Sequence, residues 1–276
     1  MHAVEQQTPE QQTPEQQTPG QQTFGDVGLV VDGHVATAEI HRPPHNFFDA
    51  GLIGWLADAY EAAAEAGARA VVLCSEGKNF CAGADFTGRS SAGQVGGGGG
   101  ARELYDEALR LFEAPLPVVA AVQGAAVGGG LGLACAADFR VASPAARFCA
   151  NFSRLGLHQG FALSATLPAI LGQQRAWDLL YTGRRVDGEE AVAMGLADRL
   201  ADEPRAAARE LAEQLAEAAP LAVRAIRATM RAGLADRAKE AMARELTEQQ
   251  KLWPTADFAE GVKATAERRT PRFEGR

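Results

Sequence analysis

The sequence predicts an α/β protein: a mostly parallel β-sheet with its covering helices, followed by a helical C-terminal region. Two patterns predict this fold. Short segments that are apolar throughout, such as Ala70–Cys74 and Pro117–Val122, alternate with helical segments, which is typical of βαβ units with buried strands. From Pro204 onward, amphipathic helical periodicity replaces this pattern. We therefore expect a β/α core over residues 25–203 and a helical region over residues 204–276.

A polar repeat precedes the core. The pentad EQQTP occurs three times between Glu5 and Pro19, and a variant, GQQTF, follows at Gly20–Phe24. Such a segment cannot bury enough apolar surface to offset the entropy that is lost on ordering. We therefore expect residues 1–24 to form a disordered tail.

The core begins with a predicted hairpin. Gly28–Val31 and Val35–Ile40 have strand character, and Asp32-Gly33 between them is typical of a hairpin turn. Asp49 is placed to cap the N-terminus of a helix over Leu52–Ala66. The later predicted elements are strands at Ala70–Cys74, Pro117–Val122 and Phe139–Ala142 and helices at Glu103–Phe112 and Leu131–Ala137. The Ser/Gly-rich segment Gly88–Gly100 is expected to be a mobile loop, and loops of this kind can gate a site.

Four amphipathic helices are predicted after the core, separated by proline or glycine. Their predicted ranges are Pro204–Ala219, Leu221–Leu234, Arg237–Leu252 and Phe258–Arg268.

Composition excludes several classes of function. The net charge is −8 and there is no block of Lys and Arg, so we expect no nucleic-acid partner. No apolar run approaches the roughly 18 residues of a membrane span. The N-terminal residues lack a basic segment followed by an apolar stretch, so we expect no signal peptide. The cysteines show no metal-ligand spacing, so we expect no metal site. We expect the four thiols to be buried core residues of a cytoplasmic protein. They are Cys74, Cys81, Cys135 and Cys149.

Two glycine-rich turns carry the functional signal. Asn79–Phe86 and Gly124–Gly132 each follow the carboxyl end of a buried strand, where open α/β sheets bind ligands. The second turn also opens a helix, whose first backbone amides are unsatisfied and carry partial positive charge. Each turn taken alone is equally well explained by tight helix–strand packing. The nucleotide-binding patterns GxGxxG and GxxxxGK[ST] are not met.

Taken together, the turns FCAGAD and GAAVGGGLG resemble those of the crotonase superfamily, the enoyl-CoA hydratase/isomerase family. Three further segments, His41–Asn46, Gly172–Leu200 and Arg268–Phe273, resemble other landmarks of that family. The resemblance implies a spiral β/α core with a C-terminal helical region. It also implies acyl-CoA thioester substrates, assembly as a homotrimer or a dimer of trimers, and no cofactor apart from the CoA of the substrate.

The resemblance assigns a role to both turns. Family members hold the thioester oxygen of an enolate-like anion with two backbone amides, which by motif position would be those of Ala84 and Gly129. Gly128, which adjoins the second amide, and Gly132 are candidates for contacting the substrate. Preorganised donors of this kind stabilise a transition state by about 3–4 kcal/mol each.

The sequence departs from the family at the two positions of the usual catalytic glutamates. By motif position these are Gly132 and Phe152, and no Asp or Glu occurs between Asp138 and Asp178. Hydration needs a base that activates water and an acid that protonates the α-carbon, so the usual acid/base pair is expected to be missing.

Substitute groups are few. His158 is a candidate general base with a pKa near neutrality, against the alternative of a structural or exposed histidine. Gln159 is a candidate for orienting water or a polar acyl group. Asp85 follows the oxyanion alanine, a position that is usually structural in this family.

Other residues are candidates for binding the substrate. Phe86, Phe152 and Phe161 suggest an apolar acyl pocket, and plain core aromatics are the alternative explanation. Arg42, and Arg268 or Arg269, are candidates for contacting CoA phosphates, against the alternative of solvated surface arginines.

Three functional hypotheses follow. The first is a lyase or isomerase that acts on an acyl-CoA through an unusual acid/base residue. The second is a hydrolase of a thioester or β-dicarbonyl bond that uses the same oxyanion pocket. The third is an acyl-CoA-binding protein that has lost catalysis.

Overall fold

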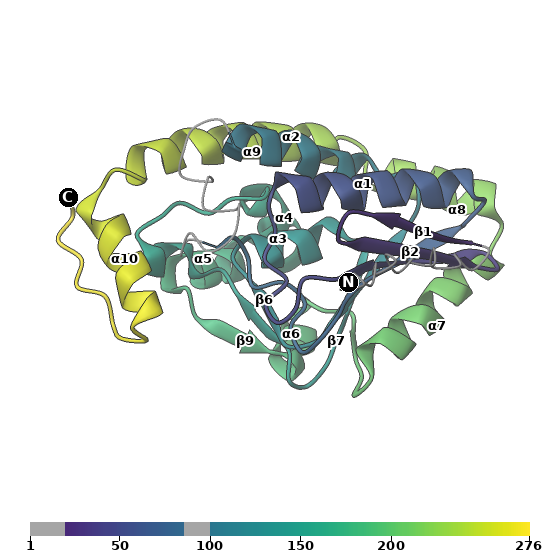
Figure 1. The fold of residues 1–276 in the computed structure, drawn as a ribbon, viewed down its shortest axis with the longest axis horizontal. Coiled ribbons are helices and arrows are strands. Elements are labelled where there is room, and N and C mark those ends of the chain that lie inside the picture. Colours follow the sequence, from purple (N-terminus) through teal and green to yellow (C-terminus); the bar gives the residue numbers. More distant parts are fainter. Residues whose placement is uncertain (1–19, 86–99) are drawn as a thin grey trace, which may run out of the picture.

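A computed structural model describes residues 20–85 and 100–276 (Figure 1). Within these residues the strands form two sheets. The larger sheet has the strand order β1-β2-β3-β4-β5-β7-β10 and the smaller has the order β6-β8-β9. The strands of the larger sheet are β1 (Gln21–Phe24), β2 (Val27–Asp32), β3 (Val35–Ile40), β4 (Ala70–Ser75), β5 (Val118–Val122), β7 (Phe139–Ala142) and β10 (Arg199–Leu200). Those of the smaller sheet are β6 (Ala125–Val127), β8 (Arg147–Cys149) and β9 (Arg185–Asp187).

The first three strands form an antiparallel meander that corrects two expectations. Gln21–Phe24, which we expected in the disordered tail, pairs with β2 from Gln21↔Val30 to Phe24↔Val27. A strand at the edge of a sheet needs only one neighbour for its backbone, so its side chains can remain polar and exposed. The predicted hairpin turn shifts by one residue to Gly33-His34, because Asp32 already pairs with Val35.

The rest of the larger sheet is parallel, as the alternating pattern predicts. β3, β4, β5, β7 and β10 pair in parallel, and every residue of β4 and β5 is buried. Helices cover both faces of the central strands, which explains why β5 and all of β4 except Ser75 are apolar.

Helices α1 (Ala50–Glu65) and α2 (Gly100–Glu113) pack against each other on one face. Asp49 caps α1 as predicted, and its carboxylate accepts the Leu52 amide at 2.8 Å. Four shorter helices follow: α3 (Gly129–Ala136), α4 (Leu163–Leu171), α5 (Gln173–Thr182) and α6 (Gly188–Met194), with a 3₁₀ helix, η2 (Asn151–Leu155), before α4.

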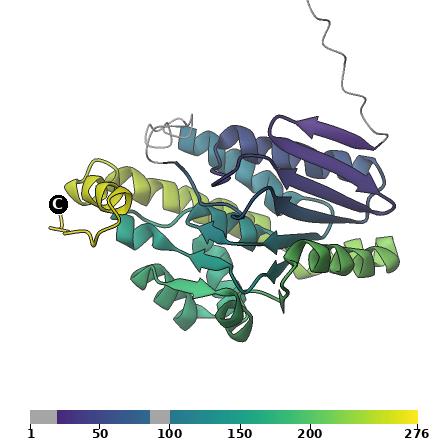
Figure 2. The same cartoon turned by 60° about the horizontal axis from the view of Figure 1, so that its bottom comes forward.

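The C-terminal helices cover the core and do not form a unit apart from it. They are α7 (Pro204–Glu217), α8 (Pro220–Met230), α9 (Leu234–Leu252) and α10 (Ala256–Ala266). α7 packs on β4 and β5, opposite α1, and Ala208 and Leu211 bury against Val72 and Val119 (Figure 1). α9 packs on α2 and α4, and α10 packs on η2 at the end of the molecule opposite the first strands (Figure 2). None of the helices in the described ranges has both the length and the apolar character needed to cross a membrane.

Candidate functional site

The two glycine-rich turns lie side by side because a short backbone bridge joins them. The Cys81 amide donates to the Ala125 carbonyl at 2.8 Å, and the Val127 amide donates to the Cys81 carbonyl at 3.0 Å. Ala84 follows Cys81 by three residues, and Gly128 and Gly129 follow Val127 directly. The bridge therefore sets Ala84 beside the first turn of α3.

Glycine is required in both turns. Gly83 has φ +90°, and a Cβ at this residue would lie 2.7 Å from the Val127 carbonyl oxygen and 3.8 Å from the Gly129 nitrogen. Gly128 has φ +58°, and a Cβ on Gly129 would overlap the Phe48 ring. Only residues without a side chain allow the turns to approach each other and Phe48 this closely.

Two asparagines fix the turns to the first strand-to-helix junction. The side chain of Asn46, fully buried, donates to the carbonyls of Glu76 and Asn79 at 2.9 and 2.7 Å and accepts the Arg42 amide at 3.0 Å. The Asn79 side chain donates to the Pro44 carbonyl at 2.7 Å and accepts the Ala125 amide at 3.2 Å. The sequence suggested only a family landmark at Asn46, because these partners are distant in the chain.

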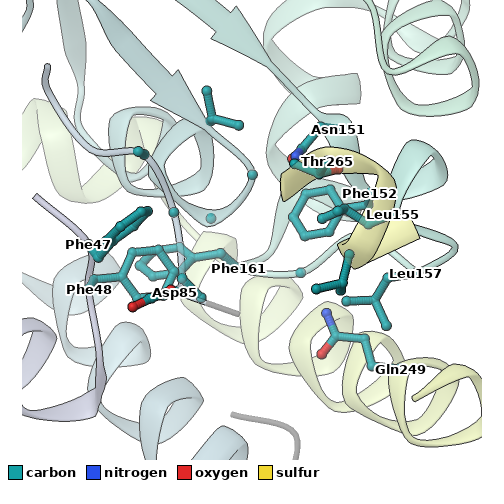
Figure 3. A pocket seen from close by; sticks show the side chains of 18 of the residues that line it. Phe47, Phe48, Asp85, Asn151, Phe152, Leu155, Leu157, Phe161, Gln249 and Thr265 are labelled. Atoms are coloured by element: carbon teal, nitrogen blue, oxygen red, sulfur yellow. The ribbon is translucent and has the colours of Figure 1, made fainter. Parts of the chain in front are cut away.

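A cavity of about 320 Å³ opens in front of both turns (Figure 3). Ala84 and Gly129 both line it. Most of the lining is apolar: Phe47, Phe48, Leu104, Phe152, Leu155, Leu157, Phe161, Trp253 and Val262. Figure 3 shows Phe47 and Phe48 on one side of the turns and Phe152 on the other. The volume and lining are those of a small-molecule pocket.

The Ala84 and Gly129 amides lack an acceptor among the residues that the structure describes. Gly129 is the first residue of α3, and the helix dipole adds partial positive charge at this point. A cavity with two unsatisfied N–H groups, one of them at a helix start, favours an oxygen atom that carries negative charge.

The space beside Gly132 is filled by an aromatic side chain. A Cβ on Gly132 would lie 2.5 Å from the Cβ of Phe161, and the Phe161 ring packs on Phe48 with centroids 5.5 Å apart. Gly132 is buried in α3 and does not line the cavity, whereas Gly128, Phe152 and Phe161 do. Within the described lining, Asp85 is the only carboxylate, and it is 3% exposed.

The structure does not bring His158 or Gln159 to the cavity. Nδ1 of His158 lies 2.8 Å from the Gln159 carbonyl oxygen, and the Gln159 side chain donates to the Ser164 hydroxyl at 3.0 Å. Neither side chain lines the pocket, although Leu157 and Gly160 on either side of them do. The geometry therefore gives no support to His158 as the base or Gln159 as a substrate ligand, because neither residue lines the cavity.

The arginines expected to contact CoA are engaged within the chain. Arg42 pairs with Asp26 at 2.5 Å and with Asp49 at 3.0 Å, and it lies over Trp55 at 5.4 Å. Arg269 pairs with Glu260. These contacts account for the position of both side chains without a ligand.

The predicted pocket residue Phe86 and nearly all of the predicted loop Gly88–Gly100 lie outside the described residues.

The cavity also has polar lining that sequence reasoning missed. The Tyr105 hydroxyl donates to Oε1 of Gln249 at 3.1 Å, and burial raises the pKa of Tyr105. Asn151, Arg185 and Thr265 also line the cavity. These residues come from α2, α9, η2, β9 and α10, so no local motif could have grouped them.

A buried carboxylate lies behind the pocket wall. Glu245 of α9 is fully buried and accepts the Ala162 and Ser164 amides, each at 2.9 Å, at the start of α4. Burial raises the pKa of Glu245. No group of three or more His, Cys, Asp or Glu side chains in the described ranges is placed to hold a metal ion.

Comparisons with known proteins agree with this architecture. Residues 31–276 match the family model described as enoyl-CoA hydratase/isomerase. A protein named probable enoyl-CoA hydratase from Mycobacterium tuberculosis (strain CDC 1551 / Oshkosh) is 40% identical over 237 residues, covering 84% of this chain and 92% of the relative. The cyclohexa-1,5-dienecarbonyl-CoA hydratase of Thauera aromatica is 33% identical over 257 residues, covering 91% and 96%.

A crystal structure of an enoyl-CoA hydratase/isomerase from Pseudoalteromonas atlantica T6c superposes with a TM-score of 0.79. It is 31% identical to this chain, and the match covers 90% of this chain and all of that one. Sequence and structure together show that the chain belongs to the enoyl-CoA hydratase/isomerase family of the crotonase superfamily.

Proposed function

We propose that this protein is an acyl-CoA enzyme in which the Ala84 and Gly129 amides hold the thioester oxygen while an enolate-like anion forms. The observation that carries the proposal is the pair of amides, unsatisfied within the described chain, that line one apolar cavity. Family membership and the names of the relatives support a CoA thioester as the substrate.

The amides act through preorganisation. Their positions are set by the Cys81 bridge and by Asn46 and Asn79, so they need not reorient when charge develops on the oxygen. Donors of this kind stabilise the transition state by about 3–4 kcal/mol each. The apolar walls exclude water and strengthen both hydrogen bonds.

Proton transfer falls to Asp85 in this proposal. It is the carboxylate of the described lining, and it directly follows the amide that holds the oxygen. A carboxylate at this position can take or return a proton near the α-carbon, which is the step that hydration and double-bond isomerisation share. The proposal uses no metal or redox cofactor.

A second candidate function is acyl-CoA binding without catalysis. The observation that favours it is Gly132, where Phe161 fills the space that the family resemblance assigns to a catalytic glutamate. A pocket that keeps both amides but has no working acid/base would bind a thioester without turning it over.

The test compares Ala84→Pro, which removes the amide proton, with Ala84→Ser, which keeps it. Turnover is measured with a panel of enoyl-, 3-oxoacyl- and aryl-CoA thioesters, and far-UV circular dichroism checks the fold. Ala84→Pro should lower kcat about 10²–10³-fold, whereas Ala84→Ser should stay within a fewfold of the parent. Asp85→Asn should lower kcat with little change in thioester affinity.

Each contrary outcome is informative. Equal activity of Ala84→Pro and the parent refutes the oxyanion role. Full activity of Asp85→Asn removes Asp85 from proton transfer. Binding of every panel member without turnover supports the second function, and thiol release without hydration points to a thioester hydrolase.

The expected trimer or dimer of trimers is also a proposal. It is supported by three apolar side chains of α8 that are largely exposed in the single chain: Leu221 (80%), Ile226 (63%) and Met230 (78%). Exposed apolar groups on one helix are typical of a surface that another copy covers.

A further inference from the structure

Arg185 is a cation in the wall of the cavity that has no ion pair within the described chain. Its neighbour Arg184 differs in this respect, because it pairs with Asp178 and Glu190, each at 2.7 Å. Arg184 does not line the cavity. The two arginines are adjacent in sequence, yet among the residues that the structure describes only Arg184 has a carboxylate partner.

The smaller sheet aims Arg185 at the same space as the oxyanion turn. Val127 of β6 pairs with Cys149 of β8, and Cys149 pairs with Arg185 of β9. Directly paired residues point to the same face of a sheet, and both Val127 and Arg185 line the cavity. Two strand spacings separate their backbones by about 10 Å.

Two more polar groups occur in the same wall. Asn151 lies next to the oxyanion turn, because a Cβ on Gly128 would be 3.2 Å from its Oδ1. Thr265 belongs to α10, which packs on η2, the element that holds Asn151. Figure 3 shows Asn151 and Thr265 with Phe152, across the turns from Phe47 and Phe48. Neither side chain has a hydrogen-bond partner among the described residues.

We propose that Arg185, assisted by Asn151 and Thr265, binds a carboxylate on the distal end of the acyl group. Arginine suits this role because its planar guanidinium can donate two parallel hydrogen bonds to a carboxylate. An amide N–H and a hydroxyl supply further donors for the same anion. The inference deepens the proposed function and rests on it, since it assumes that the thioester oxygen lies at Ala84 and Gly129.

Reach favours the acyl group over the phosphates of CoA. The phosphates are separated from the thioester by the whole pantetheine arm. Arg185 lies only two strand spacings from the strand that ends at the oxyanion turn. A short acyl chain can span the distance from the oxyanion turn to Arg185 directly. The pantetheine arm would have to fold back on itself to bring the phosphates to the same place.

The experiment compares two enoyl-CoA thioesters of equal chain length, one ending in a methyl group and the other in a carboxylate. Dissociation constants are measured by titration calorimetry and kcat/KM by turnover, for the parent, Arg185→Met, Arg185→Lys and the matched control Arg184→Met. The parent should bind the carboxylate ligand about tenfold or more tightly than the methyl ligand. Arg185→Met should abolish this preference, Arg185→Lys should keep part of it, and Arg184→Met should keep all of it.

The same two acyl groups on N-acetylcysteamine, which lacks the phosphates, separate the two anion sources. Preference for the carboxylate should persist on this carrier in the parent and vanish in Arg185→Met. If Arg185→Met instead weakens both CoA thioesters equally and leaves both N-acetylcysteamine thioesters unaffected, Arg185 binds CoA phosphate and the inference is overturned. If the parent binds both CoA thioesters equally, the inference about Arg185 is overturned and the proposed function stands. If the parent binds neither thioester, both the inference and the proposed function are overturned.

Discussion

The contact between Gly132 and Phe161 gives a prediction that can be worked out in energies. Gly132→Ala places a Cβ 2.5, 2.9 and 3.0 Å from the Cβ, Cγ and Cδ1 of Phe161, where carbon atoms normally stay about 3.5–4.0 Å apart. Overpacking of this kind costs about 1–3 kcal/mol. Alanine has about 1 kcal/mol better helix propensity than glycine, which offsets part of that cost in α3. The net expectation is a loss of up to about 2 kcal/mol in the free energy of unfolding.

Phe161→Gly removes all three contacting atoms, and glycine suits the φ of +58° at this position. In that background Gly132→Ala should stabilise by up to about 1 kcal/mol, so the two substitutions should couple by about 1–3 kcal/mol, which is the overpacking cost that is removed. Urea unfolding followed by circular dichroism, at one protein concentration, measures all four members of the cycle. Gly51→Ala is the matched control, because a Cβ at this exposed helix residue would come no closer than 3.4 Å to any atom.

Two results would refute the reasoning: a gain in stability for Gly132→Ala as in Gly51→Ala, or the same loss with and without Phe161. If the coupling is found, Gly132 can be replaced by glutamate only when Phe161 is replaced as well.

Two further predictions concern buried ionisable groups. Because burial raises the pKa of Glu245 above 4.5, the folded chain holds a proton that the unfolded chain has released, and stability should fall as pH rises from 4.5 towards the folded pKa. Glu245→Gln should flatten this part of the stability curve measured by urea unfolding between pH 4 and 8, and an unchanged slope would assign it to another group. Burial also raises the pKa of Cys74 and Cys81 to about 12, so a disulfide reagent at pH 8 should label these thiols slowly in the native protein and fast in urea, while fast native labelling would show that they are accessible.

The larger sheet was predictable because its signal is local. β4 and β5 are buried on both faces, so Ala70–Cys74 and Val118–Val122 are apolar without interruption, and these runs are visible without knowledge of their neighbours. The smaller sheet was not predictable, since β6, β8 and β9 have three residues each and no periodicity can be read from so short a segment. Strand β1 was missed for a different reason: its stability comes from backbone pairing at an edge, which a polar sequence does not reveal.

Some residues of the candidate site could also be predicted from sequence, and others could not. Ala84 and Gly129 could be placed from sequence because glycines mark both turns, and the fold brings both residues to one cavity. The sequence could not decide whether His158 faces the cavity. Its neighbour Leu157 lines the cavity, whereas Nδ1 of His158 lies 2.8 Å from the Gln159 carbonyl oxygen. Arg185 and Gln249 were missed because only the pairing of β8 with β9 and the packing of α9 on α2 bring them to the cavity.

The backbone bridge between Cys81 and Ala126 limits the order in which the parts of the site can assemble during synthesis. On a growing chain, Ala84 is made well before Gly129, and the bridge cannot form until the strand after β5 is available. The walls at Gln249 and Thr265 are added last of all. Ligand binding therefore requires segments between Phe47 and Ala266 to be in place together, and acyl-thioester affinity reports on completion of the fold more strictly than secondary structure does.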